Sequence, residues 1–278
     1  MGTLYLVATP IGNLEDMTLR ALRILKEVRL IAAEDTRTSR VLLQHFRIET
    51  PLTSYHEHNK LHKVEVIFDA LALGDVALIS DAGTPAISDP GYELVKLALA
   101  RGVRVVPIPG ASAVVTALVA SGLPTDGFVY LGFLPRKDSD RRKFLESLRR
   151  EPRTLIAYES PHRLSDALRD VQAVLGQRPV CVAREMTKHY EEFFRGTVSE
   201  ALARFQDENP KGEITLLIGG ALAQEARWDE ARVRDALRQR LQDGESLSSA
   251  AKQVASEALW RKGEVYNLGL SLADGGCE

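Results

Sequence analysis

Short apolar runs and longer amphipathic segments alternate along the first part of this 278-residue chain. The apolar runs predict buried strands at residues 3–8, 30–33, 76–80 and 103–107. The segments between them repeat apolar positions at helical spacing and predict helices at residues 19–28, 38–46, 59–73, 92–101 and 111–120. Asp16 is a suitable N-cap for the first helix. Strands that alternate with helices predict parallel βαβ units, with helices on both faces of the sheet.

The second part of the chain mixes the same elements in a different order. Its apolar runs predict strands at residues 128–131, 154–158, 180–183, 192–197 and 214–218. Helices are predicted at residues 140–150, 164–175 and 198–205. The strands between residues 180 and 218 follow one another closely, which favours antiparallel pairing there.

A helical tail follows Gly219 and Gly220, with helices predicted at residues 231–241, 246–259 and 263–270. Short helices joined by tight turns are typical of a helix-turn-helix-like module. The alternative is a small helical cap that packs on the body of the protein. The predicted fold class is α/β, with domains at residues 1–122 and 123–222 and a helical module at residues 223–278.

Composition excludes several classes of protein. The chain is 45% apolar and 27% charged, has a formal net charge of −2, and contains no apolar run long enough to span a bilayer. Its N-terminus lacks the basic and apolar segments of a secretory signal. Two cysteines, Cys181 and Cys277, are too few for a disulfide framework or a four-cysteine zinc site. A cytoplasmic protein is therefore expected, and the near-neutral charge leaves a nucleic-acid partner open.

Three loops that follow predicted strands are rich in Gly, Pro, Ser and Thr, at residues 9–14, 81–91 and 109–112. In an open parallel sheet, ligands bind beyond the carboxyl ends of the strands. Loops of this composition can hold a ligand through backbone hydrogen bonds, although ordinary βα turns have the same composition. The chain has no G-x-G-x-x-G after its first strand and no P-loop motif, so neither a dinucleotide site nor a P-loop is supported.

Carboxylates also follow several strands. Glu34 and Asp35 come after the second predicted strand, Asp81 after the third, and Glu185 after the strand near residue 183. Each alone is most simply an N-cap or half of a local ion pair. Their shared position at strand ends favours a functional role for the set.

Three histidines, His56, His58 and His62, raise the question of a metal site. Their spacing puts at most two of them on one helical face, and no cysteine lies near. A polar loop that contacts substrate is the favoured interpretation, and no metal is predicted.

Residues 136–153 are locally basic, with eight positive and four negative side chains. The basic ones are Arg136, Lys137, Arg141, Arg142, Lys143, Arg149, Arg150 and Arg153. Such a segment can neutralise several phosphates. The alternative is a solvated helix face with i,i+4 ion pairs such as Arg142 with Glu146.

Seven motifs carry a resemblance to a known family. They are LVATPIGNL at 6–14, AEDTR at 33–37, SDAGTPAISDPG at 80–91, PIPGASA at 107–113, GFLPRK at 132–137, ESPHRL at 159–164 and AREMTK at 183–188. In this order they resemble the tetrapyrrole methylase superfamily, and in it the branch that methylates small-subunit ribosomal RNA. The resemblance covers nearly the whole chain, and the motif at 80–91 is highly specific.

This resemblance implies two α/β domains with a deep cleft between them, and a homodimer. It implies S-adenosylmethionine as methyl donor and the ribose 2′-oxygen of a cytidine in the decoding region of 16S rRNA as acceptor, on the assembled 30S subunit. The implied donor-binding residues are Pro10, Asp81, Ala82, Gly83, Ile87, Ser112, Ala113, Tyr158, Arg184 and Ile214.

A ribose hydroxyl is a poor nucleophile while protonated, so a positioned base is expected. We expect Glu185 or Lys188, with Glu34, Asp35 and Arg37 across the cleft, to surround the reacting ribose. The groups expected to hold phosphates are Arg37, Arg136, Lys137, His162 and Arg163.

Two rival functions remain at this point. Relatives that modify porphyrins carry Gly-Gly-Asp-Pro where this chain has Ser80-Asp81-Ala82-Gly83, which argues against a C-methyltransferase acting on a tetrapyrrole-like small molecule. A non-catalytic ribosome-binding module would not need the donor-binding loops that this chain retains.

Overall fold

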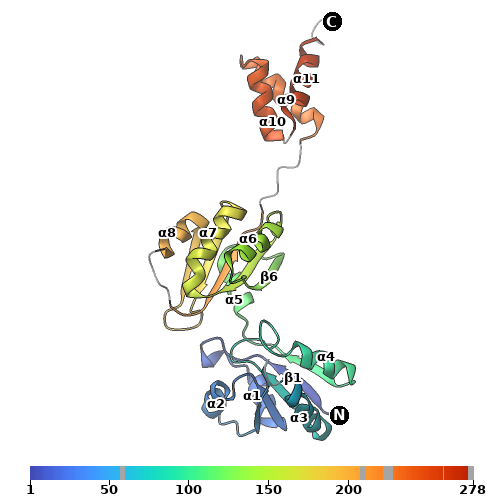
Figure 1. Cartoon of the computed structure of the whole chain (residues 1–278), viewed down its shortest axis with the longest axis vertical. Coiled ribbons are helices and arrows are strands. Elements are labelled where there is room, and N and C mark those ends of the chain that lie inside the picture. Colours follow the sequence, from blue (N-terminus) through green and yellow to red (C-terminus); the bar gives the residue numbers. More distant parts are fainter. Residues whose placement is uncertain (57–59, 207–210, 222–227, 259, 275–278) are drawn as a thin grey trace. The chain divides into compact units, whose positions relative to one another are not determined.

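The computed structural model describes residues 1–56, 60–206, 211–221, 228–258 and 260–274 (Figure 1). Contacts between residues divide the chain into two compact units, at residues 1–220 and 221–278. The first unit contains two five-stranded sheets, and the described part of the second is helical.

The first sheet is parallel throughout, as predicted. Its strands lie in the order β3-β2-β4-β1-β5. They are β1 (Thr3–Val7), β2 (Leu30–Ala33), β3 (Leu52–Ser54), β4 (Val76–Ile79) and β5 (Arg104–Ile108). The sequence did not predict β3, because this edge strand has only three residues and only one of them, Leu52, is strongly apolar.

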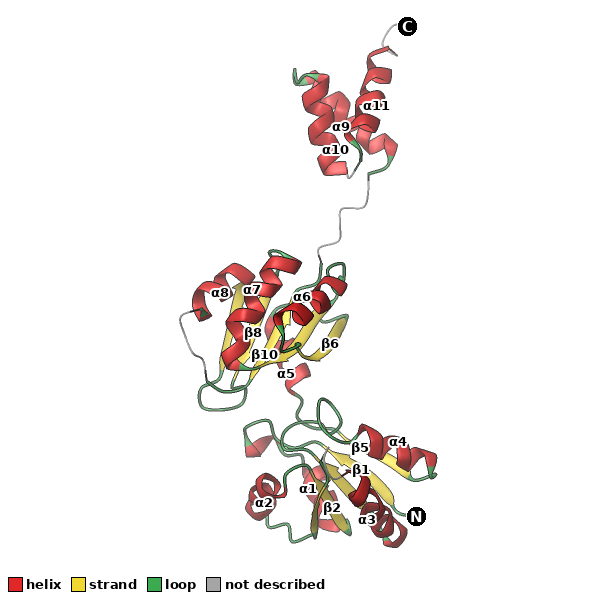
Figure 2. Cartoon of the chain, viewed as in Figure 1, coloured by secondary structure: helices red, strands yellow, loops and turns green. Residues whose placement is uncertain are grey.

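Helices cover both faces of this sheet (Figure 2). Helices α1 (Leu19–Glu27) and α2 (Thr36–His45) cover one face, and α3 (Lys60–Leu73) and α4 (Tyr92–Ala100) cover the other. Successive residues of a strand point to opposite faces. Accordingly, Ala77 and Ile79 pack with α1 and α2, whereas Val76 and Leu78 pack with α3 and α4.

The N-terminal ends of the first two helices differ from the prediction. Thr18, not Asp16, caps α1, and its hydroxyl accepts a hydrogen bond from the Ala21 amide at 3.1 Å. Asp16 lies instead in a short 3-10 turn, η1 (Leu14–Asp16). Helix α2 begins two residues before the predicted start at residue 38, because Asp35 caps it and accepts from the Arg37 amide at 2.8 Å.

The second sheet has the order β6-β7-β10-β8-β9. Its strands are β6 (Phe128–Phe133), β7 (Thr154–Glu159), β8 (Pro179–Arg184), β9 (Glu192–Thr197) and β10 (Ile214–Ile218). Only β6 and β7 pair in parallel, and the other neighbours are antiparallel. The antiparallel pairing predicted between residues 180 and 218 is thus confirmed.

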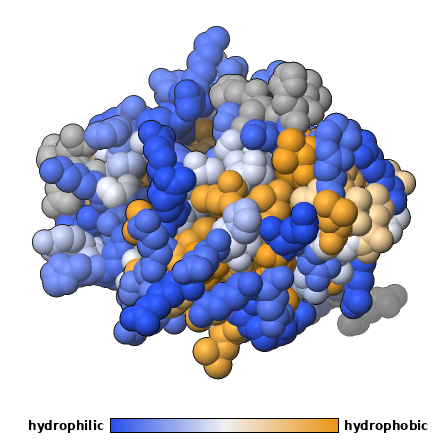
Figure 3. All heavy atoms as spheres, turned by 90° about the horizontal axis from the view of Figure 1, so that it is seen from below, coloured by the Kyte–Doolittle hydropathy of each residue, from blue (hydrophilic) through white to orange (hydrophobic). Residues whose placement is uncertain are grey.

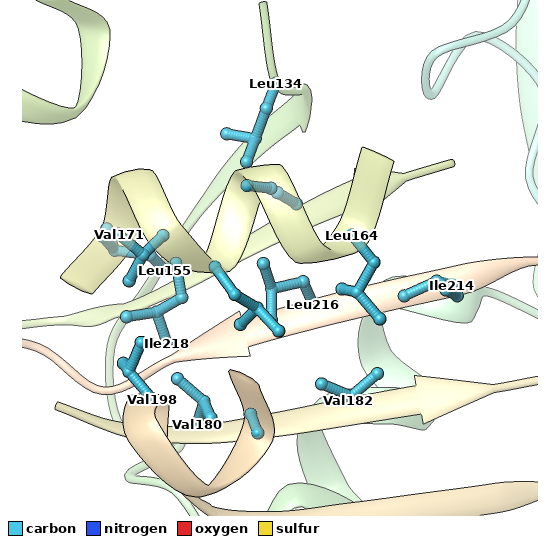
Figure 4. Close-up of a cluster of buried hydrophobic side chains, with 14 of the residues drawn as sticks. Leu134, Leu155, Leu164, Val171, Val180, Val182, Val198, Ile214, Leu216 and Ile218 are labelled. Atoms are coloured by element: carbon cyan, nitrogen blue, oxygen red, sulfur yellow. The ribbon is translucent and has the colours of Figure 1, made fainter. Parts of the chain in front are cut away.

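Helices α6 (Asp138–Ser147), α7 (Leu164–Leu175) and α8 (Val198–Phe205) cover one face of the second sheet. Figure 4 shows α7 above apolar side chains from the strands, among them Leu155, Val182 and Leu216. Helix α5 (Ala113–Ser121) packs on the other face through Val114, Ala117 and Leu118. Helix α5 therefore packs on the second sheet, although it lies within the predicted first domain, residues 1–122. The domain boundary at residue 122 remains a prediction.

The basic segment is partly structural. Arg141 is 1% exposed, and its Nε donates to Asp170 Oδ2 at 2.7 Å. Arg142 Nε donates to Asp170 Oδ1 at 2.6 Å, while Glu146 accepts from Arg149. The predicted Arg142–Glu146 pair is therefore wrong, because Asp170 of α7 offers Arg142 a buried partner. Arg141 holds α6 to α7 and is not available to a phosphate.

The second unit has its own apolar core. Helices α9 (Glu230–Gln242), α10 (Leu247–Ala258) and α11 (Lys262–Asp274) contact one another, with Val233, Leu237 and Val254 buried between them. Trp260 Nε1 donates to the Trp228 carbonyl at 2.7 Å, which ties the start of the unit to the α10–α11 turn. The three predicted helices are present, and the choice between a helix-turn-helix-like module and a cap stays open.

None of the helices in the described ranges is both long enough and apolar enough to cross a membrane.

Candidate functional site

A hollow of about 360 Å³ lies in the first unit, where loops from both sheets meet. We call it the main hollow. From the first sheet it is lined by Ile11, residues 82–84 and 87–89, Ser112 and Ala113. From the second sheet it is lined by Phe133, residues 158–161, Met186 and residues 212–215. Its walls combine large apolar side chains with a few polar groups, as small-molecule sites generally do.

The structure brings most of the predicted donor-binding residues together. Those that line the main hollow are Ala82, Gly83, Ile87, Ser112, Ala113, Tyr158 and Ile214. Pro10 and Asp81 instead line a second hollow, of about 400 Å³, with Thr38 and Ser39. Arg184 lines neither, because its guanidinium donates to Glu192 at 2.7 Å and to the Lys211 carbonyl at 3.2 Å.

Hydrogen bonds join the loops of the first sheet at the main hollow. Thr9 and Gly83 exchange two backbone hydrogen bonds of 2.9 Å, which ties the loop after β1 to the loop after β4. Thr84 Oγ1 donates to the Ala111 carbonyl at 3.1 Å and so adds the loop after β5. The three loops that the sequence singled out therefore form one connected wall.

Backbone strain gathers in two segments beside the main hollow. Ala86 and Ser88 in the loop after β4 have φ of 68° and 62°, and Glu185 and Thr187 after β8 have φ of 49° and 67°. Non-glycine residues adopt this conformation at a cost of about 1 kcal/mol or more, and such strain is concentrated at functional sites. Contacts with the surrounding structure must therefore hold these two segments in this conformation.

Carboxylates gather where β2 and β4 end. The Asp35 amide donates to Asp81 Oδ1 at 3.1 Å, and the Asp81 amide lies 3.5 Å from Glu34 Oε2. Burial raises the pKa of Glu34 and of Asp81. Burial and the nearby charge of Glu34 raise the pKa of Asp89 to about 6. We call Glu34, Asp81 and Asp89 the acidic group.

Glu185 and Lys188 form an ion pair. Lys188 Nζ lies 2.8 Å from Glu185 Oε1 and 3.0 Å from Glu213 Oε2, and the Glu213 amide donates to Glu185 at 2.9 Å. The hydrogen bond from Lys188 lowers the pKa of Glu185. Burial lowers the pKa of Lys188, but its bonds to Glu185 and Glu213 outweigh this, so that its pKa is raised. The pair therefore keeps both charges at neutral pH, which suits orientation of a ligand better than proton transfer.

Two glycines make room for this pair. A Cβ on Gly12 would lie 2.5 Å from Lys188 Cγ, and a Cβ on Gly212 would lie 2.3 Å from Glu185 Cδ. The aliphatic part of Lys188 thus packs against the loop after β1.

We expect Gly212→Ala to displace Glu185 and break its pair with Lys188. The clash adds about 1 to 3 kcal/mol of destabilisation to the cost of alanine at φ +96°. Gly176→Ala is the matched control, since Gly176 has φ +78° and no atom within 4 Å of its Cβ position. Urea unfolding midpoints measure the difference, and equal midpoints for the two variants would contradict the packing argument.

The residues predicted to hold phosphates differ in their surroundings. Arg37 is 90% exposed and pairs with Asp35 at 2.7 Å, and its hydrogen bonds lower the pKa of Asp35 to about 2. Arg163 donates to Glu159 at 2.9 Å and to the Leu134 carbonyl at 2.7 Å. Arg136, Lys137 and His162 are exposed. Arg163 is thus held by hydrogen bonds within the protein, whereas the other four predicted phosphate-binding residues are exposed to solvent.

Sequence reasoning missed Asp89, Tyr130 and Glu213. Asp89 lines the main hollow. The hydroxyl of Tyr130 forms a 2.6 Å hydrogen bond with the hydroxyl of Ser88, the residue before Asp89. A usable signal existed for Asp89, because it lies in the same loop as Asp81, the one with the most specific motif. No local pattern marked Tyr130 or Glu213, which long-range pairing brings to the site.

Among the described side chains, no group of three His, Cys, Asp or Glu is placed to hold a metal ion. Of the histidines considered as metal ligands, His58 and the side chain of His62 lie outside the described residues.

Comparisons with known proteins show the family of this chain. Residues 3–202 match the family Tetrapyrrole (Corrin/Porphyrin) Methylases. Ribosomal RNA small subunit methyltransferase I of Synechocystis sp. is 50% identical over 279 residues, which cover 99% of this chain and 100% of that protein. The protein of the same name from Bacillus subtilis is 45% identical over 273 residues, covering 96% of this chain and 94% of its own length.

Solved structures share the fold at lower identity. Uroporphyrin-III C-methyl transferase from Thermus thermophilus, complexed with S-adenyl homocysteine, has a TM-score of 0.55 and 23% identity. The match covers 78% of this chain and 97% of that one. The chain therefore belongs to the tetrapyrrole methylase family and, within it, to the group of ribosomal RNA small subunit methyltransferase I enzymes.

Proposed function

We propose that this enzyme transfers a methyl group from S-adenosylmethionine to the ribose 2′-oxygen of a cytidine in the decoding region of 16S rRNA. The observation that carries the proposal is the main hollow, which gathers seven residues of the predicted donor-binding set from both sheets. Relatives that match nearly the whole chain are named as methyltransferases of small-subunit ribosomal RNA.

The chemistry of the main hollow fits the donor. Ile87, Met186 and Ile214 offer apolar surface to an adenine ring. Ser112 and Thr215 offer hydroxyl groups to the polar parts of the molecule. When bound, S-adenosylmethionine supplies an activated methyl group on a sulfonium sulfur. The protein then mainly has to align donor and acceptor, and the hydrogen-bonded loops provide a rigid frame for that alignment.

Five charged residues are proposed to surround the reacting ribose. Glu185 and Lys188 approach from the second sheet as an ion pair, and Glu34, Asp35 and Arg37 come from the carboxyl end of β2. Arg37, with Arg136, Lys137 and His162 on the surface, would bind phosphates of the RNA. Arg163 would contribute mainly by fixing Glu159 in the wall of the hollow.

The proposed substrate is the assembled 30S subunit, the proposed active form is a homodimer, and the proposed compartment is the cytoplasm. Figure 3 shows one face of the molecule, where apolar residues reach the surface between polar ones. On α5, Val115 is 51% exposed, and a second copy of the chain would cover this residue in the proposed homodimer.

The alternative acceptor, a tetrapyrrole-like small molecule, is not favoured. The two relatives described above match over 94% or more of their length, are named for ribosomal RNA, and are 45–50% identical to this chain. The porphyrin enzyme shares the fold at 23% identity.

The test uses labelled S-adenosylmethionine with small subunits from a strain that lacks this methyltransferase. We expect label at a single ribose 2′-oxygen of 16S rRNA, located by primer extension and nucleoside analysis. Naked 16S rRNA, tested in parallel, separates a subunit substrate from free RNA. Binding of the donor without label in either RNA would exclude the proposed acceptor.

A further inference from the structure

Three carboxylates line the main hollow, those of Asp89, Glu159 and Glu213. They come from three different segments, the loop after β4, the end of β7 and the start of β10. They differ in whether each forms an ion pair with a nearby cation, and this difference indicates which of them is free to take a proton.

Two of the three are neutralised. Glu159, whose side chain has 0% exposure, pairs with Arg163 at 2.9 Å. Glu213 pairs with Lys188 at 3.0 Å. Asp89 has no ion pair with any cation in the described ranges, and it is only partly exposed.

The groups that face Asp89 are acidic or neutral. Glu34 after β2 and Asp81 after β4 act on it with like charge, and the nearby neutral hydroxyl of Ser80 offsets their effect only in part. From the second sheet, Tyr130 on β6 and Tyr158 on β7 feel its charge, and both have raised pKa values, first because they are buried. Burial and like charge both disfavour the carboxylate form of Asp89, so its pKa rises to about 6.

We propose that Asp89 is the proton acceptor for the methylated hydroxyl. The inference rests on the proposed function of the main hollow. As the ribose oxygen forms its bond to the methyl carbon, the bond from that carbon to sulfur breaks and its electron pair stays on sulfur. The hydroxyl proton passes to a carboxylate oxygen of Asp89, which later releases it to water. An acid whose pKa lies just below the working pH is ionised before the step and still basic enough to take the proton.

The assignment also gives the charged residues separate roles. Glu185 and Lys188 keep each other ionised and orient the ribose, while Asp89 accepts the proton of the hydroxyl. Glu34 and Asp81 act through Asp89, because their charges keep its carboxylate basic.

The experiment compares wild-type enzyme with Asp89→Asn in single-turnover methylation of small subunits, over pH 5 to 9. For the wild type we expect a rate that rises with pH through a midpoint near 6 and then levels off. For Asp89→Asn we expect the methylation rate to fall at least about 100-fold and to lose the midpoint near pH 6. Its affinity for the donor should stay within a few fold of wild type. Asp126→Asn, in an exposed loop outside the hollow, is the matched control and should behave as wild type.

A stability measurement provides a readout independent of activity. The pKa of Asp89 in the folded state, about 6, lies above its ordinary value of 3.8. The folded protein therefore binds this proton more readily than the unfolded chain, and its stability falls as pH rises between those values. Asp89→Asn should consequently raise Tm at pH 7.5 and leave it nearly unchanged at pH 4.

The outcomes separate the two proposals. If wild-type enzyme labels no RNA, the proposed function fails. If wild-type enzyme labels the RNA while Asp89→Asn keeps its rate and pH midpoint, only the role of Asp89 is overturned. Loss of donor binding by Asp89→Asn, with an unchanged rate at saturating donor, would also overturn it and make Asp89 a binding residue.

Discussion

Replacing Asp170 with alanine is expected to lower the stability of the first unit by about 3 kcal/mol, because it removes the buried carboxylate that pairs with Arg141 and leaves this buried guanidinium only the exposed Asp138, at 2.9 Å. The side chains of Arg141 and Asp170 are each 2% exposed and lie 2.6 Å apart. Neither charge can recover water while the fold stays closed. The urea unfolding midpoint of the full chain is the measurement.

Arg142→Ala is the matched control for this substitution. Arg142 donates to the same carboxylate at 2.6 Å, but its side chain is 60% exposed. Its loss leaves Asp170 paired with Arg141, so we expect a cost of roughly 1 kcal/mol or less. A similar loss of stability in both variants would show that burial does not set the strength of this cluster.

Filling the main hollow is expected to abolish donor binding without unfolding the protein. Ala113 is the first residue of α5, lines the hollow and is partly buried. A phenylalanine side chain at this position would project into a space of about 360 Å³. Because cofactor sites enclose most of the ligand surface, we expect Ala113→Phe to weaken binding at least 100-fold, about 2.8 kcal/mol. Calorimetric titration with S-adenosylhomocysteine measures the change.

Val119→Phe tests whether position, rather than added bulk, causes this effect. Val119 lies on the same helix, is 71% exposed and does not line the hollow. Donor binding within a few fold of wild type is expected. If Ala113→Phe also bound normally, the donor would have to lie elsewhere in the first unit.

Much of the fold could be predicted from the sequence where local signals agree. Helix α8 begins where predicted because Thr197 and Glu200 form a reciprocal capping box. The five residues of strand β10 are all buried, and four of them are apolar. Strand β3 was missed because its residues are only partly buried at the edge of the sheet, so no apolar run marks it.

The candidate site was predictable only in part. The loops after β1, β4 and β5 carry turn residues that the sequence displays directly, and parallel pairing brings them to one edge. Arg141 looked like one more surface cation, because its partner Asp170 is 29 residues away on another helix. The motif at 80–91 does contain Asp89, but its burial and the nearby charge of Glu34, which depend on the folded chain, could not be predicted from the sequence.

The place of β10 has a consequence for how the protein is made. This strand lies between β7 and β8, although the chain reaches it after both. During translation the first sheet can close once residue 108 has emerged, but the second sheet waits for residue 218 with the inner edges of β7 and β8 unpaired. Ile214 and Thr215 also complete the wall of the main hollow. Until then the nascent chain lacks a complete main hollow, and we expect it to need chaperones while these strand edges are unpaired.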